Sequence, residues 1–308
     1  MRICKKCIQP DTRPGVFFNE ESVCGACLWE DEKKKIDWTE RKKELEIIVN
    51  DAKKSNAVYD CVIGVSGGKD STKQAVTARD ELDLNCLLVN YQPENITELG
   101  RKNIENLKSL GFDLISIRPN PKIMMKVTRH DFFNHLNFVK ASEFPLYAST
   151  YIIAEKFKIP LIIQGENPGL TVGTSLTGVG TDSDALKAYQ LQTLSMGIQE
   201  YLNVDGVTEK DLYFFHYDVQ KLLDLNVKGI WIQYYLKEWS STGNAEFSKK
   251  YGFQERENIK PEEIGTYVPF NACDSDFVHV NQMLKFMKFG FGQCLDHVCY
   301  DLRDNLMD

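Results

Sequence analysis

A short apolar stretch that stops in a glycine-rich turn is the feature that most constrains this chain. Residues 62–65 read Val-Ile-Gly-Val, and Ser-Gly-Gly-Lys-Asp-Ser follows at 66–71. The apolar stretch is short and rich in β-branched residues, as in a buried strand of a parallel sheet. Residues 70–79 have the composition and spacing of an amphipathic helix. The sequence therefore predicts a strand, a tight turn and a helix in immediate succession.

The turn carries the groups that an anion-binding site needs. The backbone amides of Gly67 and Gly68 can approach a phosphate at the helix N-terminus, where the helix dipole favours negative charge. Ser66, Lys69 and Ser71 add two hydroxyl donors and a positive charge. We therefore expect a pyrophosphate-binding turn. The alternative is a simple tight turn, which would not require two hydroxyls, a lysine and a carboxylate at these positions.

The spacing separates this turn from the two commonest phosphate-binding motifs. It is neither the Walker motif nor the Rossmann fingerprint, which space their glycines differently. Instead it resembles the PP-loop of the ATP pyrophosphatase superfamily, whose members split ATP between the α and β phosphates and adenylate an acceptor. The resemblance implies ATP contacts from Ser66, Gly67, Gly68, Lys69, Asp70, Ser71 and Thr72.

Further apolar stretches continue the pattern of strand followed by helix. Strands are expected at 84–91, 113–118, 159–164 and 229–236, the last of them with core aromatic residues. Helices are expected at 96–110, 122–139, 146–157, 219–225, 244–251 and 276–289. Strands that alternate with helices indicate right-handed crossovers and one parallel sheet. The expected fold class is α/β, with an open parallel sheet of the PP-loop (adenine nucleotide alpha hydrolase-like) type.

The carboxyl end of the fourth expected strand is a second candidate site. Ligands of open parallel sheets bind at the carboxyl ends of the strands, so Gly165, Glu166 and Asn167 should face the same crevice as the turn. Glu166 and Asn167 are candidates to hold Mg²⁺ or the acceptor. The Gly- and Thr-rich segment 170–182 is predicted to be a lid or binding loop, and disordered filler is the alternative.

Two cysteine pairs near the N-terminus predict a metal site. Cys4 and Cys7 are separated by sixteen residues from Cys24 and Cys27. Each pair can place two thiolates on one tetrahedral ion, and the ribbon between them is too short to bury a core without metal. We expect structural zinc, because four thiolates leave no open position for catalysis. A redox dithiol pair, an iron–sulfur cluster and four unrelated reduced cysteines are the alternatives.

Other histidines and cysteines carry weaker signals. His130 and His135 are five residues apart and do not share a helix face as an i, i+4 metal pair would, so we expect surface or local hydrogen-bonding roles. Cys294, His297 and Cys299 invite a second metal site, but the two cysteines are widely spaced and lack a fourth partner nearby.

Composition and charge indicate a cytoplasmic globular protein. The chain has 308 residues, of which 43% are hydrophobic and 26% charged, and its formal charge of -7 argues against broad binding to nucleic acid. No apolar stretch reaches the length of a membrane span, and the first residues of the chain do not resemble a signal peptide. The nine cysteines do not suggest a secreted disulfide scaffold. We expect a zinc ribbon in 1–30, a helical connector in 31–56 and a PP-loop domain with a C-terminal helical extension in 57–308.

Later segments narrow the resemblance to one family. The segments that carry it are the ribbon, the turn, QGENP at 164–168, the region 231–239, NAEFSKKYGF at 244–253, GTY at 265–267 and LKFMKFGFG at 284–292. Together they resemble the bacterial N-acetyl sugar amidotransferases of lipopolysaccharide, O-antigen and nonulosonic acid biosynthesis. In that family an N-acetyl group becomes an acetamidino group, and ammonia comes from glutaminase and synthase partners that resemble the two subunits of imidazole glycerol phosphate synthase.

The resemblance implies a set of roles for this chain. Lys69, Asp70 and Glu166 would be catalytic, Gly165 would contact ATP, and Asp70 and Glu166 would hold Mg²⁺. The runner-up is a PP-loop tRNA-modifying enzyme of the thiolating type, which would need a reactive cysteine such as Cys273, Cys294 or Cys299. A third interpretation is a non-catalytic subunit that binds nucleotide without turnover.

Overall fold

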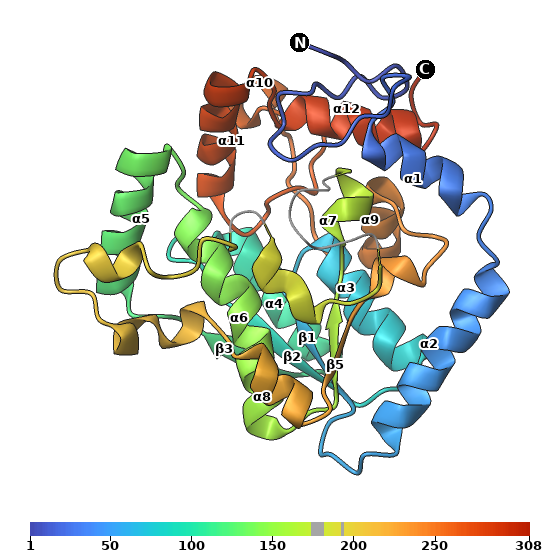
Figure 1. The fold of residues 1–308 in the computed structure, drawn as a ribbon, viewed down its shortest axis with the longest axis vertical. Coiled ribbons are helices and arrows are strands. Elements are labelled where there is room, and N and C mark those ends of the chain that lie inside the picture. Colours follow the sequence, from blue (N-terminus) through green and yellow to red (C-terminus); the bar gives the residue numbers. More distant parts are fainter. Residues whose placement is uncertain (174–181, 192–193) are drawn as a thin grey trace.

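The computed structural model describes residues 1–173, 182–191 and 194–308 (Figure 1). At its centre lies a sheet of five strands in the order β3-β2-β1-β4-β5. The strands are β1 (Cys61–Gly64), β2 (Cys86–Tyr91), β3 (Asp113–Ile117), β4 (Leu161–Gln164) and β5 (Lys228–Trp231). Every neighbouring pair is parallel. The expected open parallel α/β sheet is therefore confirmed.

Helices cover both faces of this sheet and enclose two apolar cores (Figure 1). One face carries α5 (Pro121–His135), α6 (Lys140–Phe157) and α8 (Val219–Asp224), and the other carries α2 (Trp38–Lys53), α3 (Lys69–Val76) and α4 (Glu98–Ser109). Successive side chains of a strand point to opposite faces. Val62 therefore packs in the first core, whereas Cys61 and Ile63 pack in the second.

The remaining elements surround the ends of the strands. The α-helices are α1 (Gly25–Lys33), α7 (Pro168–Thr171), α9 (Ser241–Lys249), α10 (Pro261–Ile264), α11 (Asp276–Phe289) and α12 (Gln293–Arg303). Short π-helical or 3-10 turns cover Thr77–Glu81, Leu186–Gln190, Tyr201–Asn203, Glu209–Phe215 and Ile232–Tyr234. The N-terminal ribbon packs against α12, so both termini lie at the same end of the molecule (Figure 1).

The expected helical connector, 31–56, spans parts of two helices. The first, α1, begins inside the ribbon and ends at Lys33, and α2 begins at Trp38. The side chain of Asp37 accepts a hydrogen bond from the amide of Thr39 at 2.9 Å and so caps the start of α2. An N-cap aspartate of this kind satisfies amides that the first turn of a helix leaves unpaired, which explains why a new helix starts there.

Three other boundaries differ from the expected ones. One helix was expected to end at residue 139, but α5 ends at His135 because Leu136 has a left-handed backbone (φ 47°). The next helix was expected to begin at residue 146, but α6 begins at Lys140 and includes Pro145. Pro145 is the sixth residue of α6, where it removes one backbone hydrogen bond without ending the helix. The fifth strand ends at Trp231, and its aromatic residues continue in a 3-10 turn; the fully buried Trp231 belongs to the core as expected.

Only part of the predicted lid is described. Residues 174–181 of the segment 170–182 lie outside the described residues, whereas its start belongs to α7. Within the described part of the chain, no helix combines the length and apolar character needed to cross a membrane.

Candidate active site

The glycine-rich turn joins the central strand β1 to α3 at the point where the strand order reverses. β1 pairs with β2 on one side and β4 on the other, so the carboxyl ends of β1 and β4 flank a topological switch point, the usual ligand crevice of such sheets. Gly67 has φ +77°, and a Cβ there would lie 3.0 Å from the amide nitrogen of Ile104 in α4. Only glycine suits both the conformation and the close approach.

The N-terminus of α3 is open to a ligand. Gly68 is the N-cap, and among the described residues no side chain caps this helix end. The first amides of the helix therefore lack intrahelical partners and can donate to an anion. A pocket of about 160 Å³ lies here and is lined by Ser66, Gly67, Gly68, Lys69, Asp70, Gly100, Asn103, Phe270, Asn271, Ala272, Cys273 and Asp274.

Lys69 and Asp70 form a charged pair inside this pocket. The Nζ atom of Lys69 lies 2.5 Å from Oδ2 of Asp70, and the lysine is buried. Burial alone would lower the pKa of Lys69, but the charges of Asp70 and Glu166 outweigh it and raise that pKa above its ordinary value. These carboxylates therefore favour the charged form of Lys69, which lines the pocket.

Glu166 follows β4, as expected, and faces the same pair. Burial, with the charge of Asp70 as a second cause, raises the pKa of Glu166 to about 7, and Lys69 partly opposes the shift. Glu166 therefore lies near enough to Lys69 and Asp70 for their charges to influence it, but it is not among the residues that line the small pocket. The carboxylates of Asp70 and Glu166 are oxygen donors of the kind that Mg²⁺ prefers, so the donor set fits that ion.

Not all predicted site residues reach the pocket. Thr72 is buried in α3, and the hydroxyl of Ser71 donates to the carbonyl of Gly68 at 3.2 Å. Asn167, a candidate for metal or acceptor, instead caps α7, because its Oδ1 accepts from the amide of Gly169 at 2.8 Å. Gly165 packs against α3, since a Cβ there would lie 3.1 Å from Oε1 of Gln74.

Residues of α9 and its neighbourhood support the turn and were missed by sequence reasoning. Asn244 donates from Nδ2 to Oδ1 of Asp70 at 2.8 Å, and its own Oδ1 accepts from Nζ of Lys73 at 2.9 Å. Ser248 donates to the carbonyl of Lys69 at 2.6 Å. Both residues lie in the segment NAEFSKKYGF, which carried part of the family resemblance but no assigned role. They orient the pair Lys69–Asp70 from outside the pocket.

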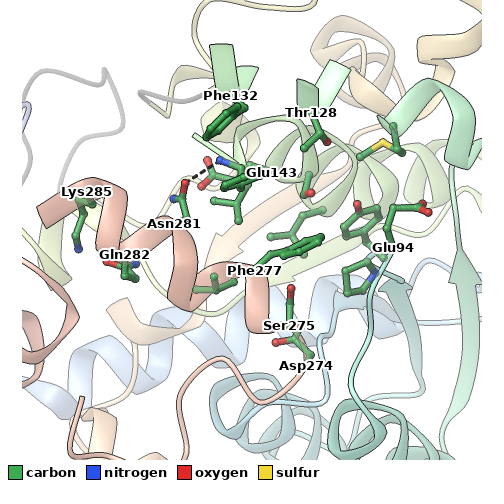
Figure 2. A pocket seen from close by; sticks show the side chains of 18 of the residues that line it. Glu94, Thr128, Phe132, Glu143, Asp274, Ser275, Phe277, Asn281, Gln282 and Lys285 are labelled. Carbon is green, nitrogen blue, oxygen red and sulfur yellow. Dashed lines mark hydrogen bonds between the residues drawn. The ribbon is translucent and has the colours of Figure 1, made fainter. Parts of the chain in front are cut away.

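A second, much larger pocket of about 1340 Å³ adjoins the first, and Asp274 lines both. Figure 2 shows α11, with Phe277, Asn281, Gln282 and Lys285, on one side of this pocket and Phe132 and Thr128 of α5 on the other. Below them lie Asp274 and Ser275, which precede α11. Asp274 therefore lies between the two pockets.

The large pocket combines aromatic walls with unpaired polar atoms. Phe132 and Phe138 stack with a ring separation of 4.6 Å, and Phe138 stacks on Phe277 at 5.9 Å. Oε1 of Gln282 and Oε1 of Glu94 are buried and have no hydrogen-bond partner within the described structure. Buried polar atoms without partners are costly, so these two oxygens point to a ligand that donates hydrogen bonds.

The four N-terminal cysteines converge as the sequence predicted. Their Sγ atoms all lie within 4.8 Å of one another, with Cys4 and Cys27 3.8 Å apart and Cys7 and Cys24 3.5 Å apart. A set of four sulfur donors at this spacing fits one tetrahedral zinc or an iron–sulfur cluster. A metal-binding ribbon is supported, and zinc specifically stays a prediction.

The C-terminal candidates do not form a second metal site. Cys299 is buried and donates to the carbonyl of Cys7 at 2.6 Å, Cys294 is exposed, and His297 pairs through Nδ1 with the hydroxyl of Thr266 at 2.5 Å. Of the groups in the described residues that could hold a metal, none includes these three side chains.

Comparisons with known proteins show distant likenesses in fold. No family model and no curated protein matches this sequence. The match to the NMN synthetase of Francisella tularensis has 14% sequence identity and a TM-score of 0.33, and it covers 88% of this chain and 94% of that chain. The match to the NH₃-dependent NAD synthetase of Campylobacter jejuni has 16% sequence identity and a TM-score of 0.33, and it covers 73% of this chain and 100% of that chain. The match to the tRNA thiolase NcsA of Methanococcus maripaludis, with its [4Fe-4S] cluster, has 14% sequence identity and a TM-score of 0.35, and it covers 99% of this chain and 88% of that chain. Likenesses this distant are not evidence about activity. Any inference about activity rests on the residues described above.

Proposed function

We propose that this protein is an ATP-dependent amidotransferase that converts the N-acetyl group of a sugar into an acetamidino group, with release of AMP and pyrophosphate. The observation that carries the proposal is that Asp274 lines both the pocket at the turn and the large pocket. A nucleotide at the turn and an acceptor in the large pocket would meet at this residue. The family resemblance of the sequence supplies the acceptor class.

The small pocket suits the pyrophosphate of ATP. The free amides at the start of α3 and the buried ammonium of Lys69 would stabilise the charge that develops on the departing pyrophosphate. Asp70 and Glu166 would hold Mg²⁺, which when bound neutralises phosphate charge. Asn244 keeps the Asp70 carboxylate oriented through the 2.8 Å hydrogen bond from its Nδ2.

The large pocket suits a sugar. Sugar rings present C–H faces that pack on aromatic side chains such as Phe132 and Phe277, and hydroxyls that donate to oxygens such as Oε1 of Gln282. The amide oxygen of the N-acetyl group attacks the α-phosphate, and the bond from that phosphorus to pyrophosphate breaks. Ammonia then attacks the imidate carbon, the C–O bond breaks, and AMP leaves to yield the amidine. Glutaminase and synthase partners would supply the ammonia.

The test is to incubate the purified protein with ATP, Mg²⁺, ammonium and a panel of N-acetyl sugars. We expect AMP to form only with the cognate sugar, whose mass should change by replacement of one oxygen with NH. The Lys69→Met variant should form no AMP, and an exposed-site variant such as Lys102→Met is the matched control. AMP formation without any change in the sugars would overturn the proposal.

A second candidate is tRNA thiolation, which one observation favours: Cys273 lines the small pocket. Burial raises the pKa of this thiol to about 11, so little of the thiolate needed for sulfur transfer is present at neutral pH. The formal charge of -7 adds no general attraction for RNA. Incorporation of sulfur into tRNA by the wild-type protein, and its loss in Cys273→Ser, would establish this alternative. ATP binding without formation of AMP under every condition would favour a non-catalytic subunit.

A further inference from the structure

A histidine–carboxylate cluster lies at the end of α5, outside both pockets. His130 and His135 each direct Nε2 to the same oxygen, Oε1 of Glu200, at 2.9 Å for His130 and in a shorter contact for His135. Glu200 lies 65 residues beyond His135, directly before the turn Tyr201–Asn203. His130 also makes the expected local contact, with Asn134, whereas the bonds of both histidines to Glu200 join residues that are distant in the chain.

We propose that His130, His135 and Glu200 bind a divalent transition-metal ion of the zinc class, with water in the remaining position. Two imidazoles and one carboxylate are a donor set that Zn²⁺ and related ions use in proteins. The candidate donor atoms of these residues and Asp131 all lie within 4.8 Å of one another. The three side chains are 22%, 32% and 23% exposed, so an ion can reach them from solvent.

A second layer of residues orients these donors. Oε2 of Glu200 accepts from Nζ of Lys140 at 2.7 Å, which leaves Oε1 for the ion. Asp131 is fully buried, accepts from the hydroxyl of Tyr201 at 2.7 Å and lies 3.5 Å from Nζ of Lys140. Metal-binding carboxylates and imidazoles are commonly fixed by partners of this kind.

The local charge also favours a cation. Two carboxylates, Asp131 and Glu200, face one ammonium, that of Lys140, so the cluster is net negative when both imidazoles are neutral. Nδ1 of His130 lies 3.2 Å from the side-chain amide of Asn134. The same amide donates from Nδ2 to the carbonyl of His130 at 2.8 Å, so Asn134 holds the ring of His130 in place.

The position of the cluster connects it to the large pocket. The helix α5 that carries both histidines also provides Thr128 and Phe132 to the pocket wall (Figure 2). Lys288 of α11, the opposite wall, donates to the carbonyl of His135 at 2.9 Å. An ion at the cluster would therefore fix the end of α5 against α6, the segment at Glu200 and, through Lys288, α11. Its role would be to hold the pocket walls and not to take part in chemistry.

Direct metal binding tests this inference independently of the proposed activity. The full chain, with its four-cysteine site filled by one equivalent of Zn²⁺, is titrated with Co²⁺ and analysed by absorption spectroscopy and metal content. We expect one further equivalent of Co²⁺, without the charge-transfer bands that thiolate ligands produce. His135→Asn and Glu200→Gln should each weaken this binding by at least about 10²-fold, whereas His216→Asn, at an exposed histidine, should leave it unchanged.

Two further measurements keep the result decisive. Near-ultraviolet circular dichroism of the variants reports whether they fold. If His135→Asn does not fold, His130→Asn removes another of the three proposed donors and should weaken Co²⁺ binding by at least about 10²-fold. The inference would be overturned if the wild-type chain did not retain an equivalent of Co²⁺ beyond the zinc of the four-cysteine site. It would also be overturned if the folded variants bound this Co²⁺ with unchanged affinity. The cluster would then be a hydrogen-bonded ion-pair network without metal.

Discussion

A Cβ on Gly25 would lie 2.9 Å from the carbonyl oxygen of Gly173. Gly25 is the first residue of α1 in the cysteine ribbon, and Gly173 closely follows α7, the helix after Glu166. The same carbonyl of Gly173 accepts from the amide of Phe17 at 2.9 Å. The ribbon therefore packs directly on the segment that leaves the candidate active site, and its integrity and that of the site are physically linked.

Gly25→Ala should destabilise the protein by about 1–3 kcal/mol, because the new methyl group meets backbone that has little room to move. In most helices the same change is favourable, since alanine has the higher helix propensity. Urea unfolding of wild type and variant measures the difference. An unchanged or higher midpoint would show that α1 and the segment at Gly173 separate freely.

Gly67→Ala should lower the rate of AMP formation by about 10²-fold, because the turn must shift to relieve the contacts with α4. Gly111→Ala is the matched control. Both glycines have positive φ, +77° and +90°, but a Cβ at Gly111 meets nothing within 4 Å. The control should lose about 1–2 kcal/mol of stability and keep its activity. Equal activities of the two variants would show that the position of the turn is not critical.

Gln282→Leu should raise the KM for the sugar by roughly tenfold and leave the KM for ATP unchanged. The free energy of unfolding should stay the same or increase, because the change removes a buried oxygen that has no partner in the described structure. This separation of stability from binding distinguishes a ligand contact from a structural one. Gln220→Leu, at an exposed position of α8, is the control. A fall in stability with unchanged KM values would contradict the assignment of this pocket.

His297 should make stability depend on pH. Burial is the main cause that lowers the pKa of His297 to about 4, below its ordinary value of 6.5. The unfolded chain therefore binds more protons than the folded chain between these values, so stability rises with pH across that window and is lost as the pH falls. The contribution is on the order of 3 kcal/mol.

His297→Asn should remove this dependence while retaining a partner for Thr266. The measurement is the free energy of unfolding of wild type and variant at several pH values between 4 and 7. His216→Asn controls for the loss of an exposed imidazole. Parallel curves for wild type and His297→Asn would mean that His297 titrates normally in the folded protein.

The metal of the ribbon should contribute to both stability and activity. Cys27→Ser removes one of four sulfur donors and should release one metal ion per chain, with a fall in Tm of at least several degrees. AMP formation should fall as well, because the ribbon packs on the segment after Glu166. Cys294→Ser, at an exposed cysteine, should change neither. Metal release without an effect on AMP formation would show that the ribbon has another role.

The sheet and the glycine-rich turn were predictable because their signals are local. A run of β-branched residues, a Gly-Gly turn and a helical period at 62–79 depend on neighbours within a few positions, and all three elements form as expected. The cysteine array was predictable for the same reason, since paired cysteines with two residues between them are already close along the chain. The predicted helix boundaries were wrong where a single residue determined the end of the helix, as Leu136 does with its left-handed backbone.

The sequence alone thus determined the fold class, the glycine-rich turn between β1 and α3, and the four-sulfur site. Only the tertiary structure decided that Asp274 lies between two pockets, that Asn244 orients Asp70, and that Glu200 joins His130 and His135. Each of these contacts links residues that are distant in the chain. Their proximity follows from how helices pack on the sheet, and no local pattern of residue types records that packing.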